Sequence, residues 1–228
     1  MRKKTSILTA VAAAAAAVAL TAPSAMAGPT AAWNVTPTGN FTGAAGQTIL
    51  TDNVGNQIKC ATATANGNAP ASPVAGPVLA QISTATFNAP CTGPFSSTWT
   101  VTSETSGANG PWRINGNTPG GYTAGAGANS TGLTKGYIDN IKATVTGSSV
   151  LGPCTFVVTG SADAEYNNPT AGGANGTLAV APAATSPRTL TISNKVGGGC
   201  GIVGATATFK GAYTVKSASG VSPVITYS

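Results

Sequence analysis

The strongest constraint on the fold of this chain is an alternation of apolar and polar residues from position 154 to position 166. In the stretch C-T-F-V-V-T-G-S-A-D-A-E-Y, every even position is apolar or small, and the odd positions are mostly Thr, Ser, Asp and Glu. Because side chains on a β-strand alternate between two faces, this pattern predicts a strand with one buried face. Residues 205–216 repeat the pattern.

The rest of the chain from residue 28 onward predicts further short strands. Residues 78–87, 98–104 and 136–145 are expected strands, and the sequences between such segments are rich in Gly, Pro and Asn, the usual turn residues. No stretch after the first 27 residues has the 3.6-residue periodicity of a helix. We therefore predict an all-β fold, an antiparallel β-sandwich or flattened barrel.

Residues 107–131 are so rich in Gly and Asn that they predict a long loop or a short hairpin. Residues 28–228 are expected to form a single secreted β domain, and if that domain consists of two similar halves, residues 107–131 are the expected seam. In each half a cysteine on a strand precedes a second cysteine in a Gly/Pro turn. That pattern arises either from a duplication or in any β-meander with disulfides.

The first residues resemble an export signal. Arg2, Lys3 and Lys4 precede an apolar, Ala-rich segment, and Ala25-Met26-Ala27 has the form of a cleavage site. We expect residues 1–27 to be cleaved and the mature protein to be secreted, either extracellular or associated with the cell wall. The apolar segment is short for a bilayer, and no second one follows, so stable membrane insertion is not expected.

Four cysteines in an exported chain predict two disulfides. Three pairings are possible, and Cys60–Cys91 with Cys154–Cys200 is favoured because each pair then brackets a run of strands. The chain has no histidine and no C-x-x-C motif, which argues against a zinc site. No metal or other cofactor is expected.

Charge gives little indication of a partner. Three of the eleven basic residues lie in the signal, and the other eight are scattered against five acidic residues. Nucleic-acid binding needs a basic stripe or patch, so a nucleic-acid partner is not expected.

Catalytic residues are not expected either. Without histidine the chain lacks the usual triads. S-A-D-A-E, residues 161–165, resembles part of the E-x-D-x-E strand of retaining β-glucanases, but Ser161 occupies the position of the nucleophile, and retention needs two carboxylates. Asp163 and Glu165 are expected on a solvated strand face, where with Asn167 they suit Ca²⁺ poorly because no loop wraps them.

The best candidate for ligand contact is the segment from Gly110 to Tyr122. It combines Trp112, Arg113 and Tyr122 with side-chain amides, and an indole beside a guanidinium can hold a sugar ring or a small molecule by stacking and hydrogen bonds. This hypothesis requires Trp112 to be exposed. The alternative is that Trp112 packs into the end of the sandwich and Arg113 is merely solvated.

Several motifs together resemble a group of uncharacterised secreted proteins from actinobacteria. They are I-S-T-A-T-F-N-A-P-C-T-G-P, G-P-W-R-I, G-P-C-T-F-V-V-T-G and G-A-Y-T-V, which begin at residues 82, 110, 152 and 211. The resemblance implies export and a disulfide-bearing β fold, and it brings no assigned activity. The composition is also similar to that of neocarzinostatin-type apoproteins, although their disulfides close short loops.

Three functions are left open by the sequence. The first is a non-catalytic extracellular or envelope-associated protein, monomeric by default. The second is a small-molecule or glycan-binding module that uses the segment around Trp112, with a cell-envelope glycan or a small molecule as its partner. The third is a hydrolase that works with carboxylates alone.

Overall fold

The computed structural model describes residues 31–149, 151–170, 175–181 and 187–228. Residues 31–228 form one compact unit. The expected signal peptide, residues 1–27, lies outside the described residues.

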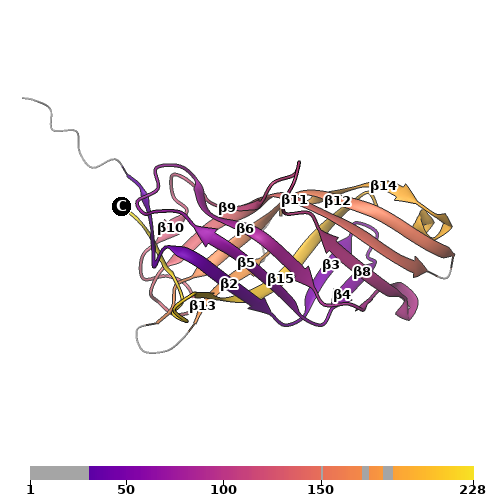
Figure 1. The fold of residues 1–228 in the computed structure, drawn as a ribbon, viewed down its shortest axis with the longest axis horizontal. Coiled ribbons are helices and arrows are strands. Elements are labelled where there is room, and N and C mark those ends of the chain that lie inside the picture. Colours follow the sequence, from indigo (N-terminus) through magenta and orange to yellow (C-terminus); the bar gives the residue numbers. More distant parts are fainter. Residues whose placement is uncertain (1–30, 150, 171–174, 182–186) are drawn as a thin grey trace, which may run out of the picture. The chain divides into compact units, whose positions relative to one another are not determined.

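Most of the described residues lie in β-strands, as expected from the alternation (Figure 1). The strands are β1 (Trp33–Thr36), β2 (Gly39–Ala45), β3 (Thr48–Asp52), β4 (Gln57–Cys60), β5 (Ala63–Ala69), β6 (Val78–Phe87), β7 (Cys91–Thr92), β8 (Thr98–Ser103), β9 (Trp112–Gly116), β10 (Tyr122–Thr123), β11 (Leu133–Ser149), β12 (Gly152–Asn167), β13 (Gly176–Val180), β14 (Leu190–Val196), β15 (Thr206–Ser217) and β16 (Val224–Tyr227). Two short 3₁₀ helices are η1 (Pro94–Ser96) and η2 (Gly198–Ile202).

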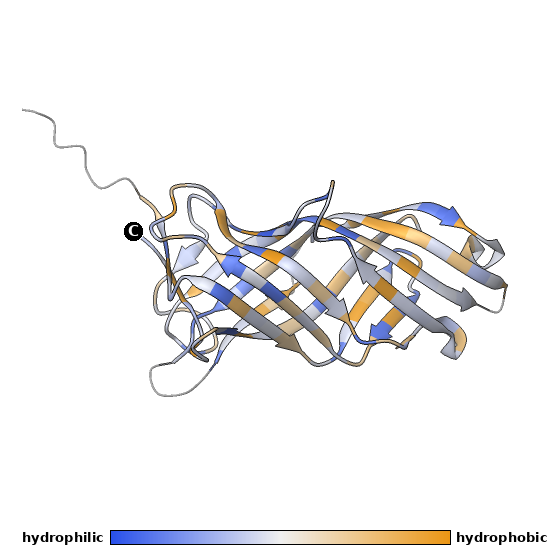
Figure 2. Ribbon diagram, in the orientation of Figure 1, coloured by the Kyte–Doolittle hydropathy of each residue, from blue (hydrophilic) through white to orange (hydrophobic). Residues whose placement is uncertain are grey.

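Alternation sets which side chains face the core. In β12, Cys154, Phe156 and Val158 are buried, whereas Asp163 and Glu165 are only half-buried and face outward. Figure 2 shows the same alternation of apolar and polar residues along many of the strands. The predicted inward face of β12 is therefore confirmed.

The main sheet is an antiparallel meander that closes on itself. β15 pairs with β13 and β14 on one side and with β2 and β3 on the other. Over the described residues the ring has eight positions: β2–β3, β4–β5, β6–β7, β8–β9, β11, β12, β13–β14 and β15. Opposite parts of the closed sheet face each other across one apolar core, so the expected all-β, sandwich-like antiparallel fold is confirmed.

Both expected disulfides are present. Cys60 in β4 is bonded to Cys91 in β7, and Cys154 in β12 is bonded to Cys200 in η2. No cysteine is free. Each bond therefore joins segments of one half of the chain, and the predicted pairing is confirmed.

The pair β1–β16 is a separate two-stranded sheet. The Tyr166 hydroxyl donates a hydrogen bond to the Pro223 carbonyl (2.6 Å), and the Asn168 side chain bonds both the N–H and the C=O of Ile225 (2.8 Å each). Trp33 is fully buried against Gly116, where an added Cβ would lie only 2.4 Å from the indole. These contacts attach the chain's first and last described strands to the ring.

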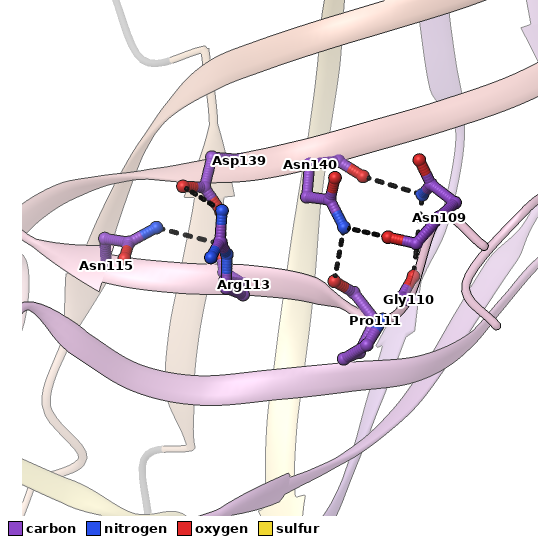
Figure 3. A network of polar contacts seen from close by, with 7 residues as sticks. All are labelled: Asn109, Gly110, Pro111, Arg113, Asn115, Asp139 and Asn140. Carbon is purple, nitrogen blue, oxygen red and sulfur yellow. Dashed lines mark hydrogen bonds and ion pairs between the residues drawn. The ribbon is translucent and has the colours of Figure 1, made fainter. Parts of the chain in front are cut away.

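Residues 107–131 are more ordered than their composition suggests, since they contain β9 and β10. Two side-chain amides hold the segment between β8 and β9 against β11 (Figure 3). Asn109 Nδ2 donates to the carbonyl oxygens of Glu104 (2.8 Å) and Asn140 (3.1 Å), and Asn140 Nδ2 donates to the carbonyl oxygens of Asn109 and Pro111 (3.0 Å). Asn140 lies at an irregularity in β11 and has a positive φ of 57°, which Asn tolerates better than most residues.

Candidate functional site

Trp112 lacks the exposure that the ligand-contact hypothesis requires, because only 6% of the residue is accessible. Trp112 is the first residue of β9 and is paired with Ile82 of β6, so its side chain turns into the core. Its indole N–H donates to the Glu104 carbonyl at 3.1 Å, which satisfies the only polar group of the ring. Trp112 thus belongs to the wall of the interior and not to a surface platform.

Arg113, the next residue, lies on the opposite face. Its guanidinium makes two hydrogen bonds to the Asp139 carboxylate, at 2.9 and 3.2 Å (Figure 3). Tyr122 is half-buried in β10, with its ring close to Gly132. The structure therefore does not bring Trp112 and Arg113 together on one surface, and contact of either with a ligand stays a prediction.

The five carboxylates of residues 28–228 all have structural partners. Asp52 accepts hydrogen bonds from the backbone N–H groups of Val54, Asn56 and Gly204. The other four form ion pairs, which are Glu104–Lys142, Asp139–Arg113, Asp163–Arg188 and Glu165–Lys135. A hydrogen bond from Lys142 is the main cause that lowers the pKa of Glu104.

Asp163 and Glu165 each form an ion pair with a basic side chain, which is not the arrangement of two carboxylates that act together on a substrate. Arg188 Nε lies 3.0 Å from Asp163, and the same guanidinium covers the ring of Tyr137 at 3.9 Å. Within the described part of the chain, no group of three or more His, Cys, Asp or Glu residues is placed to hold a metal ion.

The interior of the ring contains an apolar cavity of about 70 Å³, which we call cavity A. Every position of the ring contributes to its wall, and no Asp, Glu, Lys or Arg of the described residues lines it. Large side chains in the wall include Phe41, Leu50, Ile82, Phe87, Trp112 and Phe209.

A second cavity of about 50 Å³, cavity B, lies beside cavity A on the side of the β1–β16 pair. Phe41, Ile114, Leu178 and Val215 line both cavities, so these four side chains form the partition between them. Val35, Pro223 and Ile225 form the part of the wall of cavity B that comes from β1, β16 and the residue before β16. The two cavities are therefore neighbouring parts of one apolar interior, and the side chains of the partition separate them.

Two buried tyrosines in these walls should make the stability of the protein depend on pH in the alkaline range. Tyr213 lines cavity A and Tyr166 lines cavity B, and burial raises the pKa of both phenols well above the usual value of about 10. In the unfolded chain both phenols ionise above about pH 10, whereas in the folded protein they stay protonated. The contribution of this pKa difference to stability is therefore fully present below about pH 10 and is lost as the pH rises further.

We expect the free energy of unfolding to fall as pH rises above about 10, by up to about 1.4 kcal/mol per pH unit for each tyrosine. Urea titrations between pH 8 and pH 11 measure this slope. Tyr213→Phe should reduce it, and Lys210→Met, an exposed site on the same strand, serves as the control for changes on β15. An equal alkaline slope in wild type and Tyr213→Phe would contradict the assignment.

The alternation placed some of the wall residues on inward faces, such as Val158 and Tyr213, but it gave no signal for a cavity. A void depends on how side chains from distant strands fit together, and alternation reports only the face on which each one lies. Trp112 was identified as a candidate for ligand contact, with packing into the core as the open alternative, and the structure shows that it is buried.

In the described ranges, no helix is both long and apolar enough to cross a bilayer. Comparison with known proteins found no family model, no curated protein and no solved structure that matches the chain.

Proposed function

We propose that this is an exported, non-catalytic binding protein that holds a small, mainly apolar molecule inside its closed sheet. One observation carries the proposal, namely the apolar cavity A in the middle of the ring. A closed antiparallel sheet of about eight strands has an interior that side chains just fill or that holds one small ligand. Here they leave about 70 Å³ unfilled.

The size of the cavity limits the ligand. An apolar cavity of about 150 Å³ lined by Leu, Ile and Phe takes up benzene or xenon and stays free of water. Cavities A and B are smaller, about 70 and 50 Å³. They suit a xenon atom or a slender chain that displaces the partition side chains, and they are too small for a sugar ring.

The contacts of the polar residues favour this function over the two alternatives. A glycan-binding surface around Trp112 would need an exposed indole, whereas Trp112 is buried in the interior. A carboxylate-based hydrolase needs two carboxylates free to act on substrate, whereas Asp163 and Glu165 are within ion-pair distance of Arg188 and Lys135.

Two features support export to an oxidising compartment. Both disulfides are formed, and such bonds persist mainly outside the cytosol. The first 27 residues have the pattern of a signal peptide. Mass spectrometry of the protein from the culture medium tests this part, with a mature N-terminus at Gly28 expected.

Xenon tests the proposed binding site directly. Methyl NMR spectra recorded under increasing xenon pressure should show saturable shifts for Val145 and Val158, which line cavity A. Ala143→Val, a change in the same wall, should remove these shifts because the added methyl groups occupy the space. Wild-type spectra that do not respond to xenon, or that respond only at exposed methyl groups, would rule the proposal out.

A further inference from the structure

Each of the two cavities has in its wall a buried threonine hydroxyl with no hydrogen-bond partner among the described residues. Thr48 lines cavity A and Thr134 lines cavity B, and they are 1% and 3% exposed. Among the described residues, neither side-chain oxygen has a hydrogen-bond partner. Both therefore lack, inside the protein, the hydrogen bonds that they would make in water.

Thr48 differs from threonines of nearby strands in the face on which it lies. Thr42 in β2 and Thr64 in β5 face outward and are exposed, whereas Thr48 stands at an inward position of β3, opposite the buried Cys60. Valine has nearly the same shape and would fill this position without the loss of a hydrogen bond. A buried polar group without a partner is rare in proteins and needs a cause.

The surroundings of Thr48 determine what kind of group could bond to it. The described wall of cavity A has no charged side chain, so an ionised group in a ligand would lack the partner that a buried charge requires. A neutral hydroxyl or carbonyl needs only one hydrogen bond. The Thr48 hydroxyl can donate to a carbonyl or accept from an alcohol.

We infer that Thr48 is the specificity-determining residue of the interior site and that the ligand class is a slender, neutral molecule with one hydroxyl or carbonyl group, such as a short-chain alcohol or ketone. Its polar atom bonds to the Thr48 hydroxyl, and its chain lies in cavity A toward the partition with cavity B. This inference rests on the proposed function, since it names the ligand class of the same site.

Two probes and two matched variants test the inference. Xenon reports on the apolar cavity alone, and 1-butanol reports on the cavity together with the hydrogen bond. Thr48→Val should weaken 1-butanol binding about tenfold, as expected for the loss of one hydrogen bond, and should leave xenon binding unchanged. Thr134→Val, the same change in the wall of cavity B, should alter neither affinity. Methyl NMR titrations measure both.

Thermal unfolding adds an independent readout. If the Thr48 hydroxyl has no partner in the unliganded protein, Thr48→Val should melt at the wild-type temperature or above it. A lower melting temperature would show that the hydroxyl already bonds within the protein, and the inference would be wrong. Unchanged 1-butanol affinity in Thr48→Val, or a loss that appears in Thr134→Val instead, would also overturn it.

The outcomes separate the two proposals. If xenon binds to the wild type but Thr48→Val binds 1-butanol as tightly as the wild type does, the cavity is a binding site and only the ligand class is wrong. If neither xenon nor 1-butanol binds to the wild type, both the proposed function and the inference are wrong.

Discussion

Trp112→Ala should lower the free energy of unfolding by about 3–5 kcal/mol, the usual cost of removing a large aromatic side chain from a core. Trp112 is 6% exposed, and its indole lines cavity A and donates to the Glu104 carbonyl, so its loss enlarges a cavity and leaves that carbonyl without this donor. Chemical denaturation followed by circular dichroism measures the change. Trp112→Phe should cost less, since it keeps most of the volume.

The adjacent residue provides the control. Arg113 lies on the outer face, and its side chain is 47% exposed while it bonds to Asp139. An exposed ion pair is typically worth less than about 1 kcal/mol, so Arg113→Ala should change the melting temperature little. A Trp112→Ala variant that melts within a degree or two of the wild type would place the indole on the surface and contradict the structure.

Removal of the Cys154–Cys200 disulfide should cost about 4 kcal/mol. In the chain-entropy model the cost follows the loop length, which is 46 residues for this bond and 31 for Cys60–Cys91. Because the dependence is logarithmic, the two bonds should be worth nearly the same. For a domain of this size, such a loss corresponds to a fall in melting temperature of about 10 °C.

Calorimetry of the double variants Cys154→Ser/Cys200→Ser and Cys60→Ser/Cys91→Ser measures both values. Each double variant replaces two buried sulfur atoms, so the two double variants serve as controls for one another. Reduction of the wild type with a thiol should lower the melting temperature further than either double variant does alone. If the reduced protein melts as the oxidised one does, the bonds do not stabilise the fold.

Much of the fold could be predicted because long alternating segments carry a strong signal. The predicted strand 78–87 coincides with β6, and the inward face predicted for residues 154–166 is the buried face of β12. The disulfide pairing was also predicted correctly, since each pair encloses neighbouring strands of one half.

The candidate site was predicted less well, for physical reasons. β9 has only five residues, and its Trp-Arg-Ile-Asn alternation is short enough to be masked by the Gly-rich sequence around it. Its position depends on Asn109 and Asn140, which are 31 residues apart in the chain and bond to each other's backbone. No local pattern reports such a pairing, and none reports an unfilled volume or an unpaired hydroxyl such as that of Thr48.

Closure of the sheet also makes folding depend on the pairing of strands that lie far apart in the sequence. Strands β2 and β3 lie within the first quarter of the chain and have β15 as one neighbour. The residues of β15 that pair with them begin at Ala207. Contacts between such distant residues form slowly, because a long loop must be closed before they bring any gain. Until β15 pairs, β2 and β3 present an unpaired edge to which another chain can add. A partly folded chain in which β15 has not yet paired is therefore the state that we expect to be most prone to aggregation.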